Sequence, residues 1–317
     1  MRAIRRKPIL QPDIWTWVEG LKIAFEVITF GGEKQPSPEE ARAAVIPVPW
    51  EATVSYGRGT SLGPAAVMCA SGHMELYEPD LGMEPYKLGI LTLPAVDVSG
   101  PAERVLARIA DVVSTQIAAG RLPAVLGGEH TVTLGALKAM VRHYGLGFTV
   151  MVLDAHLDLR EEFEGSGYSH ACVMKRALDM GLSVRQVGIR SCSVEEAKLV
   201  KERGLCPVWA WEADQDGQWI EKSLQGVSGP VYVSLDVDGL DPSCMPATGT
   251  PEPGGLSWYQ VNRWLAEICR RHQVLGLDLV ELAPLSQQPA WDFTAARLLY
   301  RALGLALQSG RPRSGRD

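Results

Sequence analysis

The sequence predicts an α/β fold: a three-layer α/β/α sandwich with a mainly parallel central sheet. From about residue 121 onward, short apolar runs alternate with segments of helical periodicity, which is the order that βαβ units produce. The apolar run at residues 148–153 is continuous, as in strands that helices cover on both faces. We find no internal repeat and no low-complexity linker, so we expect residues 1–317 to form one domain.

The predicted elements follow each other closely along this part of the chain. Strands are expected at residues 122–126, 148–153, 185–189, 207–211, 230–235 and 274–279, and helices at 131–144, 169–179, 194–203, 256–272 and 293–308. Thr131 is expected to cap its helix, because a hydroxyl oxygen at that position accepts a backbone hydrogen bond. Residues 242–255, rich in proline and glycine, directly follow a strand and are expected to form a functional loop. Residues 1–40 are the least regular part, and we expect an N-terminal arm there.

Composition and charge narrow the class of protein. An apolar fraction of 46 % and a charged fraction of 21 % are typical of a globular protein, and a net charge of −6 disfavours a nucleic-acid partner. No segment reaches the roughly 18 apolar residues that a membrane helix needs, and the basic N-terminus lacks a signal peptide's apolar core. The six cysteines are scattered and form no CxxC pair. We therefore expect a cytoplasmic protein without a membrane segment.

Polar side chains follow three of the predicted strands, where parallel sheets bind ligands. Residues 127–130 form a Gly-Gly-Glu-His turn that directs His130 across the strand ends, although a single histidine is more often a hydrogen-bonded core residue. Asp154, His156 and Asp158 follow the next strand and share one face if the strand geometry persists. Three such side chains on one face indicate a metal site more strongly than they indicate solvation of a strand end.

The third strand end carries further acids. Asp236 and Asp238 again share a face, whereas Asp241 precedes a proline and is expected to form a turn rather than to bind metal. If the first two converge with Asp154 and Asp158, each like-charge pair costs about 4 kcal/mol at ~4 Å and an effective dielectric of roughly 20. Two divalent ions would balance four carboxylates, and one ion would not.

The chemistry of the candidate ligands indicates which metal they would bind. Four carboxylates with His130 and His156 form an oxygen-rich set without thiolate, which favours manganese over structural zinc. Two such ions close together hold a water-derived nucleophile at neutral pH. The residues therefore predict a binuclear manganese centre.

These three segments, in this order, resemble the signature motifs of the arginase/agmatinase (ureohydrolase) family. The likeness extends from about Pro47 to the C-terminal helix, and residues 59–64 and 249–256 resemble two further loops of the family. It implies an arginase-like fold, trimers or hexamers, and hydrolysis of a guanidino group to urea and an amine. It also implies two manganese ions per subunit: His130 and Asp158 on one, His156 and Asp238 on the other, and Asp154 and Asp236 on both.

The same resemblance implies three catalytic residues. Asp158 would relay a proton to the leaving amine, and His170 matches the family's mobile histidine, a proton shuttle. Glu281 matches the acid that faces the substrate guanidinium, for which a carboxylate is suited because the two forks match. Without the resemblance, His170 would equally indicate the start of a helix, and Glu281 a solvated strand end.

Departures from the family pattern bear on the substrate. Glu129 stands where Asp is usual and Thr131 where Ser is common, and both keep the chemistry. Leu159 and Arg160 replace the small polar residues that hold an amino-acid substrate in arginases, so we expect a small cationic substrate, agmatine or its aminopropyl derivative. The net acidic loop at residues 160–164 either attracts a cationic tail or is simply solvated.

Several alternatives remain open. Arginase or guanidinobutyrase activity would use the same site, and formiminoglutamate is a further candidate substrate. Arg160 would favour guanidinobutyrate if it faced the pocket, but we expect it to point away, paired with Glu161, Glu162 or Glu164. A single-zinc deacetylase-like hydrolase is a more distant alternative, which His130 and the second set of ligands disfavour. Nothing in the sequence supports a non-catalytic family member.

Overall fold

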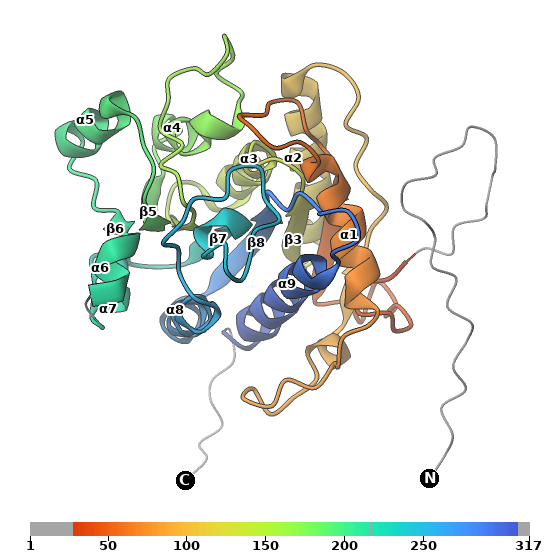
Figure 1. Cartoon of the computed structure of the whole chain (residues 1–317). Coiled ribbons are helices and arrows are strands. Elements are labelled where there is room, and N and C mark those ends of the chain that lie inside the picture. The colour runs from red at the N-terminus through yellow and green to blue at the C-terminus, as the bar shows by residue number, and fades with distance from the viewer. Residues whose placement is uncertain (1–27, 216, 310–317) are drawn as a thin grey trace.

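A fully parallel sheet lies at the centre of the protein. The computed structural model describes residues 28–215 and 217–309. In these residues an eight-stranded sheet has the order β2-β1-β3-β8-β7-β4-β5-β6, and neighbouring strands run parallel (Figure 1). The strands are β1 (Ala43–Val48), β2 (Ile90–Thr92), β3 (Leu122–Gly127), β4 (Thr149–Leu153), β5 (Ser183–Ile189), β6 (Val208–Trp209), β7 (Val231–Asp236) and β8 (Val274–Val280).

Helices cover both faces of this sheet (Figure 1). The α-helices are α1 (Gly63–Ser71), α2 (Ala102–Ala118), α3 (Val132–Tyr144), α4 (Val173–Asp179), α5 (Val194–Glu202), α6 (Ala210–Gln215), α7 (Trp219–Leu224), α8 (Trp258–Arg271) and α9 (Ala290–Gln308). Short 3-10 turns are η1 (Thr60–Leu62), η2 (Pro85–Leu88), η3 (His170–Cys172) and η4 (Val237–Gly239). Helices α1, α8 and α9 pack on one face, and α2, α3 and α4 on the other.

Successive residues of the central strands pack in the hydrophobic cores on opposite faces of the sheet. In β3, Leu126 packs with the side chains of α1 and α9, whereas Val125 packs with those of α2 and α3. Leu153 and Val152 divide in the same way at the end of β4. Each such burial contributes about 1.5–3 kcal/mol, which explains why these strands are apolar on both faces. The predicted three-layer sandwich is confirmed.

Local sequence explains where some helices begin. Ser257 and Gln260 form a capping box at the start of α8, in which the side chain of each residue accepts a hydrogen bond from the backbone N–H of the other. Thr131 does stand at the N-cap of α3, but its hydroxyl donates to Glu129 Oε1 (2.5 Å) and makes no capping bond. The predicted cap is therefore wrong, because a buried carboxylate two residues earlier takes the hydroxyl.

Most predicted elements coincide with observed ones to within two or three residues, and two differ in kind. The strand expected at residues 207–211 is only β6, since helix α6 begins at Ala210. The helix expected at residues 169–179 begins as the 3-10 turn η3. The alternation along the sequence is clear only from residue 121, yet β1, α1, β2 and α2 precede it.

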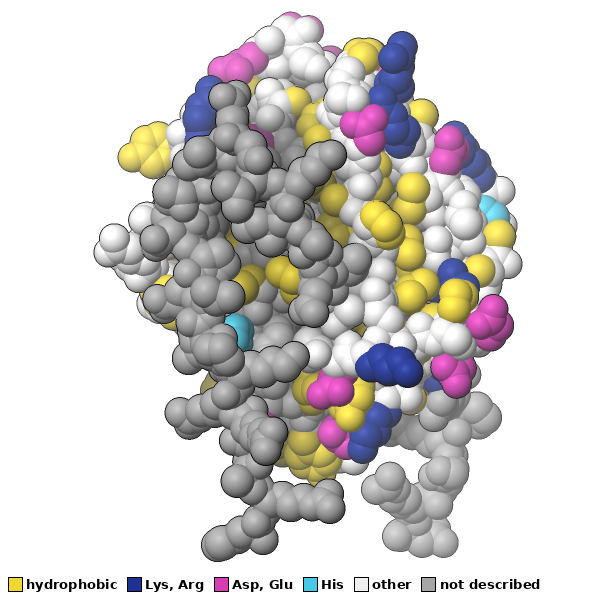
Figure 2. Space-filling model, turned by 90° about the vertical axis from the view of Figure 1, so that its right-hand side faces the viewer, with side chains coloured by type: hydrophobic (Ala, Val, Ile, Leu, Met, Phe, Trp, Pro, Cys, Tyr) yellow, Lys and Arg dark blue, Asp and Glu magenta, His cyan; other side chains and the backbone are white. Residues whose placement is uncertain are grey.

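Most of the expected N-terminal arm lies outside the described residues, which begin at residue 28. Of the part that is described, Phe30 is buried, its backbone N–H donates to Thr92 Oγ1 (2.9 Å), and its ring lies 6.3 Å from that of Tyr300. On the face shown in Figure 2, the described basic and acidic side chains are interspersed with hydrophobic ones. Over residues 28–215 and 217–309, no helix is long and apolar enough to cross a membrane.

Candidate metal centre

Four neighbouring strands determine where the site lies. In the order β3-β8-β7-β4, these central strands run parallel, so their carboxyl ends meet at one edge of the sheet. The segments that follow them carry all six residues predicted as metal ligands: His130 after β3, Asp154, His156 and Asp158 after β4, and Asp236 and Asp238 at the end of β7 and in η4. The structure brings these six side chains together, and we call them the inner cluster.

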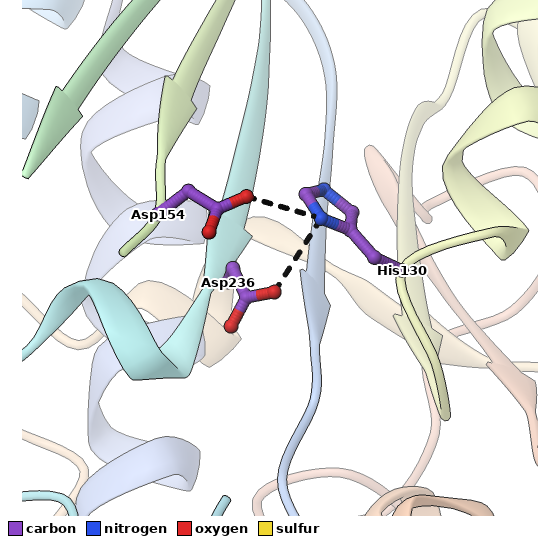
Figure 3. A group of neighbouring side chains, drawn as sticks. All are labelled: His130, Asp154 and Asp236. Atoms are coloured by element: carbon purple, nitrogen blue, oxygen red, sulfur yellow. Dashed lines mark ion pairs between the residues drawn. The ribbon is translucent and has the colours of Figure 1, made fainter. Parts of the chain in front are cut away.

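His130 faces three carboxylates with one atom. Its Nδ1 lies 3.0 Å from an oxygen of Asp158, 3.3 Å from one of Asp154 and 3.4 Å from one of Asp236. Figure 3 shows the imidazole directed at Asp154 and Asp236 from the opposite side of the space between them. One N–H could donate to only one of the three, and neither Nδ1 nor Asp154 Oδ2 has a hydrogen-bond partner although both are buried. A cation among these atoms would satisfy all of them.

A second group of ligands shares Asp154 with the first. His156 Nδ1 lies 3.0 Å from Asp238 Oδ2 and 3.6 Å from Asp154 Oδ1. His130, Asp154 and Asp236 form one group with metal-ligand spacing, and Asp154, His156 and Asp238 form the other. The residues therefore fit two adjacent cations, with Asp154 between them.

The carboxylates perturb one another strongly because they are buried together. Burial, and then the charge of Asp154, raises the pKa of Asp158 to about 7. Burial and the charges of Asp238 and Asp154 raise the pKa of Asp236 well above its ordinary value. Burial alone would lower the pKa of His156, but the carboxylates of Asp238 and Asp154 raise it to about 12. The cluster thus attracts positive charge, which divalent ions supply without protons.

Strand alternation does not explain this convergence, contrary to our expectation. Strand β4 ends at Leu153, and Asp158 has the left-handed backbone angle φ 52°. The carbonyl of Asp158 accepts hydrogen bonds from Met174 N and Lys175 N at the start of α4, both at 3.0 Å. The chain therefore curls back over the strand end, and the first turn of a helix holds Asp158 in place.

The side of His130 that faces away from the inner cluster contacts Ser234, which in turn contacts Asp278. Neither residue was predicted from the sequence to belong to the site. His130 Nε2 lies 3.0 Å from Ser234 Oγ, which donates to Asp278 Oδ1 (2.7 Å). Asp278 is fully buried in β8 and also accepts from Thr133 Oγ1 and Tyr232 Oη. Since Asp278 takes the serine proton, Ser234 accepts from His130 Nε2–H, and Nδ1 is left unprotonated toward the cluster. The signal was an aspartate inside an otherwise apolar strand, which requires buried partners.

Two glutamates lie on either side of His130 along the edge of the sheet. Glu281 has φ 65°, and its Oε1 accepts from His130 N (2.6 Å), which leaves Oε2 for the pocket. Such a left-handed conformation in a residue other than glycine costs about 1–3 kcal/mol and is common at functional sites. Burial raises the pKa of Glu129, and four hydrogen-bond donors counteract this shift.

Every residue of the inner cluster except Asp154 lines the floor of a cavity of about 190 Å³. Its wall includes Thr53, Ser55, Tyr56, Arg160, Phe163 and His170, which we call the outer wall. Asp241 is not among the lining residues: its oxygens accept from Ser243 N, Gly254 N and Gly255 N, so the predicted turn is confirmed.

His170 stands in the outer wall among three hydroxyl groups. Its Nδ1 lies 2.8 Å from Thr53 Oγ1 and 3.5 Å from Ser169 Oγ, and its Nε2 lies 2.8 Å from Ser55 Oγ. The ring meets that of Phe163 edge to face, with centroids 5.5 Å apart. Burial, and then positive charge in the inner cluster, lowers the pKa of His170 to about 4. The imidazole is therefore neutral near pH 7.

Arg160 faces the cavity, whereas we expected it to point away. It lines the cavity, its guanidinium lies 5.3 Å from the ring centroid of Phe163, and its nearest carboxylate is Glu196 at 4.0 Å. Glu161, which we expected as a partner, forms ion pairs with Lys175 and Arg176 instead. The prediction that Arg160 points away and pairs within its own loop is wrong, because helix α4 supplies stronger partners for the loop acid.

A parallel α/β sheet that gathers carboxylates and histidines at its carboxyl edge defines a class of metal-binding enzymes. The chain belongs to the arginase family, which it matches over residues 41–304. It is 38 % identical over 279 residues to the N(1)-aminopropylagmatine ureohydrolase of Synechocystis sp., covering 86 % of this chain and 91 % of that protein. The enzyme of the same name from Thermus thermophilus is 40 % identical over 281 residues, covering 88 % and 95 %.

A solved structure shows the same architecture. The agmatine ureohydrolase of Thermoplasma volcanium is 32 % identical and superimposes with a TM-score of 0.80, over 89 % of this chain and 95 % of that one. The predicted family and fold are confirmed.

Proposed function

We propose that this protein hydrolyses the guanidino group of agmatine or of its aminopropyl derivative, releasing urea and a primary amine. The observation that carries the proposal is His130 Nδ1 directed at three carboxylates, beneath a cavity into which Glu281 also projects. The names of the relatives from Synechocystis and Thermus support this choice of substrate.

We propose that the inner cluster holds two manganese ions. Four carboxylates carry four negative charges in a buried site, and the ligand set contains no thiolate, which suits manganese. When bound, the two ions supply a nucleophile from water at neutral pH and offset the charge of the carboxylates.

The residues of the chain would bind the substrate and handle its protons. Glu281 receives the planar guanidinium on Oε2, because Oε1 is occupied by the backbone N–H of His130. Asp158 lies at the floor of the cavity, 3.0 Å from His130 Nδ1, and would accept a proton from the nucleophile and pass it to the leaving nitrogen. His170 faces the same cavity and would pass a proton from solvent to the departing amine.

The test is a urea-release screen with manganese across agmatine, aminopropylagmatine, guanidinobutyrate, arginine and formiminoglutamate. Metal content is measured in parallel, before and after treatment with a chelator. We expect activity to be lost with the metal and to return with manganese better than with zinc or magnesium. Full activity in a metal-free sample would refute the proposed centre.

Guanidinobutyrate is a second candidate substrate, and one observation favours it. Arg160 lines the cavity and could pair with the carboxylate at the end of that molecule. Its stacking on Phe163 and its proximity to Glu196 partly compensate its charge, so we place it second. If guanidinobutyrate is turned over as well as agmatine and this activity is lost in Arg160→Ala, the polyamine assignment fails and the ureohydrolase chemistry stands.

We further propose one domain for the whole chain, and a homotrimer or homohexamer by analogy with the family. Light scattering after size-exclusion chromatography measures the number of subunits, and a monomer would exclude the proposed assembly.

A further inference from the structure

Glu129 is a buried carboxylate that the proposed reaction does not use. It is 1 % exposed, and its Oε2 accepts from Ala52 N (2.6 Å) and Thr53 N (2.5 Å). Its Oε1 accepts from Thr131 Oγ1 (2.5 Å) and Thr53 Oγ1 (3.1 Å). Four donors surround one carboxylate, so the ionised form is satisfied and Glu129 acts only as an acceptor.

Thr53 connects this carboxylate to His170. A hydroxyl group has one proton, and Thr53 gives it to Glu129 Oε1. Its oxygen then has only lone pairs for its other two neighbours, His170 Nδ1 at 2.8 Å and His170 N at 3.2 Å. If the proton pointed at His170 instead, the oxygens of Thr53 and Glu129 would face each other 3.1 Å apart without a proton between them.

We infer that Glu129, acting through Thr53, fixes His170 in the neutral tautomer that carries its proton on Nδ1. Glu129 is thus a positioning residue: it lies 76 positions from Thr53 in the sequence and determines which ring nitrogen of His170 has a free lone pair. That nitrogen is Nε2, which lies 2.8 Å from Ser55 Oγ on the exposed side of the wall.

His130 supports the inference because it shows the same arrangement with the ring turned. There, Asp278 takes the proton of Ser234, which fixes the proton of His130 on Nε2 and leaves Nδ1 for the inner cluster. In both cases a buried carboxylate takes the proton of one hydroxyl group, and the hydroxyl oxygen then accepts the proton of one ring nitrogen. The carboxylate thus orients the imidazole and its lone pair.

For the role of His170 the inference rests on the proposed function. A proton from solvent enters at Nε2 and leaves from Nε2 to the departing amine, while the Nδ1 proton stays with Thr53. With the other tautomer, Nε2 could give up its proton only if Nδ1, which faces Thr53, took up another, because the ring would otherwise become an imidazolate. The tautomer of His170 follows from contacts within the protein and can be measured without substrate.

The tautomer can be observed directly. Two-bond ¹H–¹⁵N correlation spectra of the full-length, ¹⁵N-histidine-labelled protein distinguish the two neutral forms, with diamagnetic magnesium in place of manganese. His170→Asn identifies the signal. We expect the Nδ1–H form at pH 7, and an Nε2–H form would overturn the inference.

Glu129→Gln reverses the hydrogen bonds and is the decisive variant. Its amide oxygen must face the two backbone N–H groups, so its NH₂ group donates to Thr53, whose proton then turns to His170 Nδ1. We expect His170 to switch toward the Nε2–H form and kcat to fall about tenfold, with KM within about twofold and metal content unchanged. Retention of the Nδ1–H form in a folded Glu129→Gln protein would overturn the inference.

Matched variants separate this effect from a loss of structure. Glu196→Gln alters another buried glutamate at the cavity, which accepts from Leu159 N and Ser193 N, and it should leave the tautomer of His170 unchanged. If Glu129→Gln does not fold, the pair Thr53→Val and Thr53→Ser decides: valine should abolish the preference for Nδ1–H, and serine should keep it. An unchanged tautomer in Thr53→Val would refute the link, whereas absence of urea release in the wild type would refute only the proposed function.

Discussion

The inner cluster and the outer wall of the same cavity are built in different ways. Five residues of the inner cluster have side chains at most 8 % exposed, and His156 is 25 % exposed. They lie at the carboxyl ends of β3, β4 and β7, within four neighbouring strands of the sheet. In the outer wall, Arg160 is 43 % exposed and Tyr56 is 84 % exposed, and its residues come from loops far apart in the chain. This contrast indicates that the sheet determines where metal binds, and that the loops determine which substrate is accepted.

The largest expected effect comes from the inner cluster. Asp236→Ala should remove both metal ions and lower urea release by more than the roughly 100-fold typical of residues that only support a ligand. The reason is that the family resemblance implies Asp236 as a ligand of both ions. Mass spectrometry of the purified protein measures metal content, with Asp241→Ala as the control, since Asp241 only holds a turn. If Asp236→Ala still bound two ions, the conclusion that the inner cluster is the part of the cavity that binds metal would be wrong.

A change in the outer wall should affect turnover without affecting metal. His170→Ala should lower kcat by about 100-fold, the lower end for a lost proton donor, and should keep both ions. Metal content and steady-state kinetics on the same sample test this. If His170→Ala loses metal as completely as Asp236→Ala, the role of His170 is that of a ligand and not of a shuttle.

Residues that hold a metal ligand in place should affect metal affinity less than the ligands themselves. Asp278→Asn removes the acceptor that orients Ser234 and thereby His130, and it should weaken metal affinity about 10- to 100-fold. Titration with manganese measures the affinity. Asp292→Asn, which changes a buried acid at the start of α9, is the control and should leave the affinity unchanged.

The smallest expected effect is on substrate choice. We expect agmatine to be cleaved with a kcat/KM about tenfold higher than that of L-arginine. Arg160 offers a partner to the α-carboxylate of arginine but repels its α-ammonium group, which must then lose water without compensation. Competition between the two substrates in one assay measures the ratio. A preference for arginine would show that the outer wall supplies a partner for that ammonium group.

The sequence was sufficient for the parts of the site that depend on neighbouring residues. Runs of apolar residues predicted the central strands, and the acids and histidines at their ends identified the residues of the inner cluster. Both follow from elementary chemistry, because a carboxylate is rarely left at the end of a buried strand without a partner. The residue types also led us to expect manganese, since oxygen-rich ligand sets favour it.

Only the tertiary structure could decide contacts between distant segments. The contact of Asp278 with Ser234 depends on the register in which β7 and β8 pair. The hydrogen bond from Thr53 to Glu129 and the direction of Arg160 depend on how loops pack over the sheet. Strand periodicity predicted that Asp154 and Asp158 share a face, but it was the left-handed turn at Asp158 that brought them together. A hydrogen bond depends on distance and angle in space, and a sequence pattern constrains these only within one strand or one helical turn.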